Sequence, residues 1–141
     1  MQKFTNYKIK KNRVDWQPAP DIDKRIKKLV KVLGLSWIRE KSIYSFRSKN
    51  SKTRACARIW GLSRIWQKAL KKNPSYIIEV ISEKFDKLSQ TEQDKVLLHE
   101  ISHIPKNFSG SLVPHYRKGK RKFSNKVNGL ISKYMKNKRK A

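Results

Sequence analysis

The stretch "SQTEQDKVLLHEISHIP", residues 89–105, decides the fold, because it predicts one complete helix together with both of its ends. Ser89 and Glu92 have the spacing of a capping box at the start. Pro105 ends the helix, since the residue before a proline is pushed out of the α region. Between them, apolar residues recur at helical spacing, namely Val96, Leu97, Leu98, Ile101 and Ile104.

The same predicted helix carries His99, Glu100 and His103, the pattern H-E-x-x-H. Residues four apart on a helix lie on one face, one turn above the other. In this pattern two neutral imidazoles hold Zn²⁺, and the glutamate takes a proton from a water that the metal activates. A histidine on a helix is more often an ordinary surface or core residue. The spacing, the intervening glutamate and the helix nevertheless favour a zinc site with Glu100 as catalytic base.

A catalytic zinc site needs a third protein ligand and one open position. No acidic residue follows the motif, and the only downstream histidine is His115. A loop over 106–114, which contains a glycine and a proline, could return this side chain to the helix. An upstream acid, Glu83 or Asp86, is the alternative ligand. Three histidines favour an open catalytic site over a closed structural one, although such sites accept several divalent metals.

The rest of the chain predicts an α+β fold. A helix is expected over 21–33, with Asp21 as its N-cap and Gly34 after its end. Strands are expected over 42–48 and 76–82, a final helix over 121–137, and the segment 54–70 is ambiguous. We expect a short mixed or antiparallel sheet, packed against the motif helix and two further helices. The domain would cover 17–137, between a basic arm (1–16) and a basic tail (138–141).

The formal charge of +26 on 141 residues indicates contact with a polyanion, most simply nucleic acid or a ribonucleoprotein. The charge is uneven: residues 73–105 hold six acids and three Lys, whereas 106–141 hold twelve Lys or Arg and no acid. Trp60 and Trp66 lie among arginines and could stack on bases, but we expect them in the core. The candidate phosphate-binding residues are Lys10, Lys11, Arg13, Arg47, Lys49, Lys52, Arg54, Lys118, Lys120, Arg121 and Lys122.

Other features narrow the class of protein. Cys56 is the only cysteine, so an internal disulfide is impossible and a reducing, cytoplasmic location is expected. No apolar run approaches the length of a membrane span. The N-terminal stretch is basic and has no apolar core of a secretory signal.

Three stretches carry a family resemblance: "RACARIWGLSRIWQKAL" (54–70), "YIIEVISEKFDKL" (76–88) and "KVLLHEISHIPKNFSGSLVPH" (95–115). Together they resemble the minimal, zincin-like metallopeptidase family of archaea and phages over residues 21–118. The resemblance implies that His99, His103 and His115 hold the metal and that Glu100 is the base. The strongly basic ends of this chain depart from that family.

Two functions are therefore expected. The first is a zinc metallopeptidase whose basic surface associates with nucleic acid or a ribonucleoprotein. The alternative is a non-catalytic nucleic-acid-binding or ribosome-associated protein that keeps the scaffold and metal site. By analogy with zincin-like folds, "YIIEVIS" (76–82) is the expected strand to which a peptide substrate would add. Tyr116 and Arg117 are candidates, on proximity alone, for stabilising an oxyanion.

Overall fold

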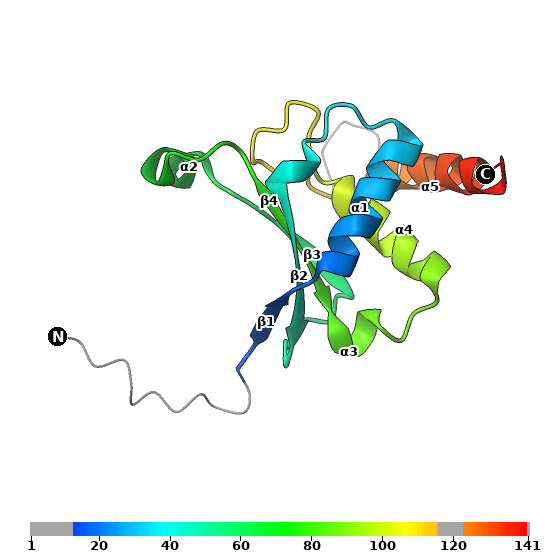
Figure 1. Cartoon of the computed structure of the whole chain (residues 1–141), viewed down its shortest axis with the longest axis horizontal. Coiled ribbons are helices and arrows are strands. Elements are labelled where there is room, and N and C mark those ends of the chain that lie inside the picture. Colours follow the sequence, from blue (N-terminus) through cyan, green and yellow to red (C-terminus); the bar gives the residue numbers. More distant parts are fainter. Residues whose placement is uncertain (1–12, 116–122, 141) are drawn as a thin grey trace.

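The centre of the molecule is a four-stranded mixed sheet with strand order β1-β2-β4-β3 (Figure 1). The structure, a computed structural model, describes residues 13–115 and 123–140. Strands β2 and β4 are parallel, while β1 is antiparallel to β2 and β3 is antiparallel to β4. The α+β class and the mixed sheet are thus confirmed. The strands are β1 (Asp15–Pro18), β2 (Ile43–Lys49), β3 (Ala57–Gly61) and β4 (Tyr76–Ile81).

Strand β1 was not expected, and it crosses the predicted boundary between the basic arm (1–16) and the domain (17–137). All four of its residues are exposed, so it lacks the alternation of apolar and polar residues that marks a half-buried strand. Its pairing with β2, which brings Asp15 opposite Lys49 and Pro18 opposite Phe46, holds it in place. The first twelve residues of that arm lie outside the described residues.

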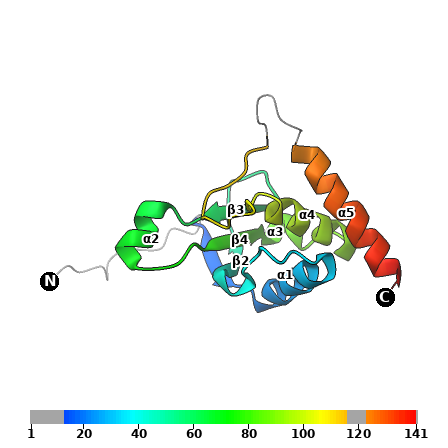
Figure 2. The same cartoon turned by 90° about the horizontal axis from the view of Figure 1, so that it is seen from above.

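Three helices, α1 (Pro20–Leu33), α4 (Gln90–Ile101) and α5 (Phe123–Lys140), gather on one side of the sheet (Figures 1 and 2). Their apolar side chains meet the inward face of the sheet in one continuous core. Within the described residues, no helix covers the opposite face of the sheet. The fold therefore has two layers, with one face of the sheet left open. Two short helices, α2 (Arg64–Leu70) and α3 (Ser82–Phe85), and a 3₁₀ turn, η2 (Glu40–Ser42), complete the elements.

The ends of α1 show one correct and one wrong prediction. Gly34 adopts the left-handed conformation that closes the helix, as expected. Asp21 is not the N-cap: the cap is Ala19, and Pro20 occupies the first turn, where its missing N–H costs nothing. Asp21 instead accepts a hydrogen bond from Arg47 at 2.6 Å, which holds its pKa below the ordinary value. The acid therefore ties α1 to β2.

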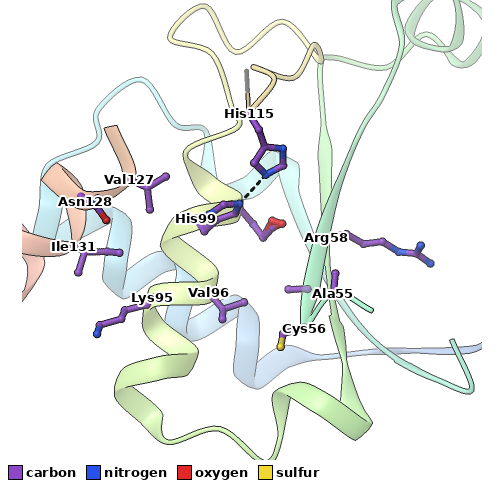
Figure 3. Close-up of a pocket in the computed structure, with 12 residues that line it drawn as sticks. Ala55, Cys56, Arg58, Lys95, Val96, His99, His115, Val127, Asn128 and Ile131 are labelled. Carbon is purple, nitrogen blue, oxygen red and sulfur yellow. Dashed lines mark hydrogen bonds between the residues drawn. The ribbon is translucent and has the colours of Figure 1, made fainter. Parts of the chain in front are cut away.

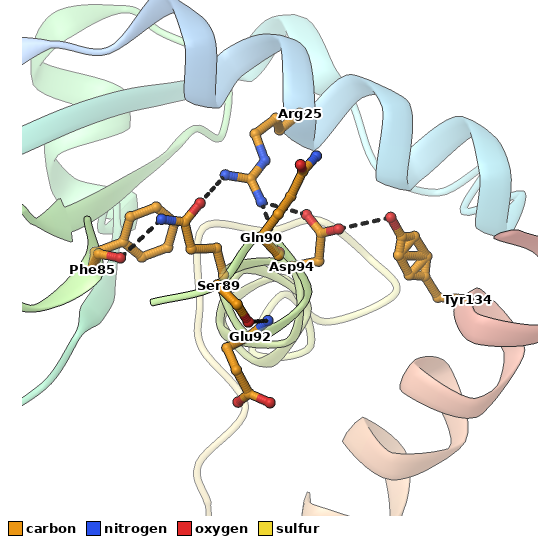
Figure 4. A network of polar contacts seen from close by, with 8 residues as sticks. Arg25, Phe85, Ser89, Gln90, Glu92, Asp94 and Tyr134 are labelled. Carbon is orange, nitrogen blue, oxygen red and sulfur yellow. Dashed lines mark hydrogen bonds and ion pairs between the residues drawn. The ribbon is translucent and has the colours of Figure 1, made fainter. Parts of the chain in front are cut away.

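A buried polar network joins the three core helices (Figure 4). Asp94 on α4 accepts a hydrogen bond from Arg25 of α1 at 2.6 Å and one from the Tyr134 hydroxyl of α5 at 2.8 Å. Burial raises the pKa of Tyr134 to about 12, and its bond to Asp94 adds to this, so the phenol stays protonated. At the start of α4, the Ser89 side chain accepts a hydrogen bond from the backbone N–H of Glu92, which confirms the predicted cap.

The ambiguous segment 54–70 forms β3, which ends at Gly61, and then α2, which projects away from the body of the molecule (Figure 1). The expectation that Trp60 and Trp66 lie in the core was wrong, since they are 46% and 57% exposed. At the other end of the chain, α5 continues through the expected tail as far as Lys140. We keep the single domain over 17–137 as a proposal. No helix in the part of the chain that the structure describes is long and apolar enough to cross a membrane.

Candidate metal centre

The three histidines of the chain lie together at the end of α4. Figure 3 shows two of them, His99 and His115. One ring nitrogen from each of His99, His103 and His115 lies within 4.8 Å of the other two. The Nε2 atoms of His99 and His115 are 3.0 Å apart, although sixteen residues separate them. Helix α4 ends at Ile101, not at Pro105 as predicted, so His99 lies in the helix and His103 in the turn that follows it. In that turn the N–H of His103 donates to the carbonyl of Glu100 at 3.1 Å. The loop farther along the chain supplies the third ring. Within the described residues this is the one cluster of potential metal ligands.

His103 is oriented by a second contact. Its Nδ1 atom lies within hydrogen-bonding distance of the carbonyl oxygen of Val113, which can only accept. Nδ1 therefore carries the proton, and Nε2 keeps the lone pair that a metal needs. Metal-binding histidines usually donate their other N–H in this way. The ring also stacks on Phe123 of α5, with centroids 4.2 Å apart, so helix α5 closes one side of the cluster.

The loop that delivers His115 is held mainly by Tyr76, at the start of β4. The buried Tyr76 hydroxyl donates to the carbonyl of Ser111 and accepts from the N–H of Gly110, both at 2.8 Å. The N–H of Val113 donates to the carbonyl of His103 at 2.7 Å. Sequence reasoning missed Tyr76, because an aromatic residue at the start of a strand has the pattern of an ordinary core residue.

The end of β3 touches the same loop through two glycines. A Cβ atom added to Gly61 would overlap the carbonyl oxygen of Gly110, so the two backbones are in direct contact. Gln67 of α2 bridges the two segments, since its amide donates to the carbonyls of Leu62 at 2.7 Å and Ser109 at 2.9 Å. Gly61, which ends β3, therefore also holds the loop that carries His115.

Glu100 lies next to the three rings and is 7% exposed. Its Oε2 atom has no hydrogen-bond partner among the described residues. Burial raises the pKa of this carboxyl to about 7. A buried carboxylate oxygen without a partner is costly unless a cation or a bound water compensates it. Three imidazoles and this oxygen together fit a divalent cation that carries a water.

The electrostatics of the cluster favour neutral imidazoles, the form that binds metals. Burial lowers the pKa of His99, and the neighbouring imidazoles lower it further. Burial also lowers the pKa of His103, to which the charges of His115 and Lys126 contribute. The stretch 97–115 has few cations of its own, but Lys95 and Lys126 approach the site in space.

The rings of His99 and His115 line a pocket of about 570 Å³ between β3, α4 and α5 (Figure 3). Its walls include the segment 55–58, Val96, Val127 and Ile131. The upstream acids lie elsewhere: Glu83 accepts a hydrogen bond from the N–H of Asn50, and Asp86 pairs with Arg47. The alternative of an acidic third ligand therefore finds no support within the described residues.

The expected substrate strand has to be corrected. Strand β4 is paired on both sides, with β2 and with β3, so its backbone cannot accept another strand. Strand β3 is at the edge of the sheet, and its residues Ala57 and Arg58 line the pocket. The unpaired edge in this part of the described structure therefore belongs to β3, and it faces the histidines.

The predicted basic residues are scattered. Arg13, Lys49, Lys52 and Arg54 are exposed. Arg47 is occupied by ion pairs with Asp21 and Asp86, so the phosphate-binding role expected of it is not supported. The positions outside the described residues are Lys10, Lys11, Lys118, Lys120, Arg121 and Lys122, together with the oxyanion candidates Tyr116 and Arg117.

Comparison with known proteins assigns the chain to a family. A family described as "Putative phage metallopeptidase" matches residues 14–130, which is most of the chain. The matched range includes the whole sheet, the histidine cluster and the start of α5. No curated protein and no solved structure matches the chain significantly.

Proposed function

The chain belongs to the phage metallopeptidase family, and from that premise we propose that it is a zinc-dependent peptidase. One observation carries the proposal: three imidazoles converge beside a buried carboxyl group, one oxygen of which has no hydrogen-bond partner in the described structure. A site that only stabilised the fold would have no use for such a group. His99, His103 and His115 would hold the ion, and Glu100 would act on the reacting water.

The donor set fits zinc. A tetrahedral Zn²⁺ ion lies about 2.0–2.1 Å from each histidine nitrogen, which places neighbouring ligand atoms about 3.3 Å apart. The 3.0 Å between His99 and His115 is close to that separation. Three histidines leave one position open, as catalytic zinc sites require. When bound, the ion would supply Lewis acidity that activates water at neutral pH.

The residues of the chain would perform the remaining steps. Glu100 would take the proton from the attacking water and return it to the leaving amine. Its raised pKa suits a group that must accept and release a proton near neutral pH. The edge of β3 would hold the peptide as an added strand, so that its backbone pairs with Ala57 and Arg58 beside the histidines.

The proposal is tested with the purified full chain. Metal analysis without chelators should find about one zinc ion per chain, and a mixture of unstructured peptides should be cleaved. Glu100→Gln should lower the cleavage rate about 10²–10⁴-fold while zinc content stays unchanged. Glu92→Gln, an exposed glutamate on the same helix, is the matched control and should cleave like the wild type. Equal activity in the wild type and Glu100→Gln would exclude Glu100 as the base.

The charge of +26 supports a second function, association with nucleic acid or a ribonucleoprotein. A peptidase has no need of such a charge, whereas a polyanion-binding protein does. Affinity for nucleic acid should fall steeply as salt concentration rises, because phosphate contacts release counterions. A chain that bound nucleic acid but cleaved no peptide would favour the non-catalytic alternative.

A further inference from the structure

The face of the sheet opposite the helices carries a row of exposed aromatic side chains. We call it the open face and define it by its outward-pointing residues, which are Trp16, Tyr44, Phe46, Arg58, Trp60, Ile77 and Glu79. Trp16 is 52% exposed, Trp60 46% and Tyr44 40%. Trp16 comes from β1, Tyr44 from β2 and Trp60 from β3, so all but one of the strands contribute an exposed ring. Such an aromatic surface on a monomer usually marks a binding site.

The open face is also hollowed. A concavity of about 430 Å³ is lined by Trp16, Phe46, Trp60, Ile77 and Glu79. A second hollow begins beside it, at the side chains of Tyr44, Trp60 and Ile77. The two share Trp60 and Ile77, so together they form one trough that runs across the strands. A flat ligand of several rings, rather than one compact molecule, fits a trough of this form.

Polar contacts fix the rings before any ligand binds. The Trp60 indole N–H donates to Glu79 at 2.9 Å, and the Arg58 Nε–H donates to the same carboxylate at 2.8 Å. The Arg58 guanidinium lies over the Trp60 ring, 4.8 Å from its centroid. Lys72 lies 5.1 Å from the centroid of Tyr44 and donates to its hydroxyl. Two of the exposed rings thus carry a cation beside them, and Arg58 compensates the buried charge of Glu79.

We propose that the open face binds single-stranded nucleic acid by stacking bases on Trp60, Tyr44 and Trp16. Aromatic rings recognise unpaired bases because every base offers a flat π surface. Four-stranded sheets with exposed aromatics bind two or three RNA bases in this manner. Lys72, which lies beside the Tyr44 ring, would pair with a phosphate. The net charge favours nucleic acid as the ligand of this face. A chain of charge +26 repels a second copy of itself and attracts a polyanion.

This proposal rests on the nucleic-acid association proposed above and assigns that association to the open face. It does not depend on peptide cleavage. The open face and the histidine cluster lie on opposite sides of the sheet. The outcomes of the two experiments can therefore be separated: Glu100→Gln should bind an oligonucleotide as tightly as the wild type.

The test uses the full chain with labelled poly-U RNA and poly-dT DNA of about twelve nucleotides, within the usual site size of such proteins. Fluorescence anisotropy should show binding of both single strands, and weaker binding of a duplex of equal length. Trp60→Ala and Trp16→Ala should each weaken single-strand binding about tenfold. Trp66→Ala removes an equally exposed tryptophan from α2, outside the open face, and should bind like the wild type.

The other results would each overturn the proposal. Equal binding by wild type, Trp60→Ala and Trp16→Ala would place the nucleic acid elsewhere, on charge alone, and leave the broader association standing. Equal affinity for the duplex would exclude base stacking. Binding to phosphatidylserine vesicles but to no oligonucleotide would assign the face to a membrane. A wild-type dimer that Trp16→Ala converts to a monomer would assign it to a second copy. If Trp60→Ala does not fold, Tyr44→Ala tests the same trough.

Discussion

Gly61 and Gly110 meet backbone to backbone, with no room for a side chain between them. A Cβ added to Gly61 would overlap the carbonyl oxygen of Gly110, and a Cβ added to Gly110 would overlap the carbonyl oxygen of Leu62. Gly110 also has a φ of 93°, a conformation that residues with a side chain rarely adopt. This contact sets the distance between the end of β3 and the loop that carries His115.

Gly61→Ala should therefore displace the loop and weaken zinc binding while leaving the core in place. We expect a loss of about 10–100-fold in affinity, the range found when groups that orient metal ligands are removed. Competition with a chromophoric chelator measures it. Gly129→Ala on α5 is the control, because a Cβ there meets no neighbouring atom. Unchanged affinity in Gly61→Ala would show that the loop position does not depend on this contact.

Alanine at His99, His103 or His115 should reduce zinc from about one ion per chain to well below that, because two imidazoles hold the ion much less tightly than three. Metal analysis after dialysis measures the content. Glu83→Gln and Asp86→Asn should retain full zinc, since both acids are occupied by other contacts. Loss of zinc in either of these variants would contradict the three-histidine site.

Glu79 should make stability depend on pH in the acid range. Burial raises the pKa of its carboxyl, but hydrogen bonds from Arg58 and Trp60 outweigh this, and the net pKa lies below its ordinary value. A carboxyl whose pKa is lowered by folding stabilises the folded state above its unfolded pKa, and this contribution is lost as the pH falls through the folded value. Urea unfolding of the wild type from pH 7 to pH 3 should show the loss. The difference in stability between wild type and Glu79→Gln should shrink over the same range.

Tyr134→Phe should destabilise the protein without affecting the histidines. The change removes the hydrogen bond to Asp94 and leaves part of a buried carboxylate without a partner, at a cost of about 1–3 kcal/mol in the free energy of unfolding. Urea denaturation measures this cost. Zinc content should stay at the wild-type level, because Asp94 keeps its bond to Arg25 and α4 keeps its place. A neutral effect on stability would mean that this bond does not hold α5 to the core.

The motif helix could be predicted from sequence because its signals are local. Ser89 caps the helix and its apolar side chains face the core, as predicted. The helix ends at Ile101, however, so His103 reaches His99 from the turn that follows the helix. His115 could be selected by elimination among histidines. The position of His115 beside the other two histidines could not be predicted. It depends on contacts that Tyr76 and Gly61, residues of two distant strands, make with the loop in the folded protein.

Exposure was the least predictable property. The pattern of β3 gives no sign that Trp60 faces away from the helices, since this depends on which side of the sheet the helices cover. Pairing was equally hidden. The apolar residues of 76–82 predict a strand, but they do not show that the strand lies between two others. Because both of its edges are paired, it cannot bind a substrate strand.

The strand order has a consequence for how the chain folds. Strands β2 and β3 follow one another in the sequence, yet they never pair, because β4 lies between them. Strand β3 therefore makes no hydrogen bond in the sheet until residues 76–81 are present. Strand β2 likewise lacks its parallel partner until then. Pairings between distant segments are slow to form, because the intervening chain must first be closed into a loop. A chain cut before Tyr76 would leave β2 and β3 without their shared neighbour, so the pair of β1 and β2 is the only part of the four-stranded sheet that could form before β4 joins.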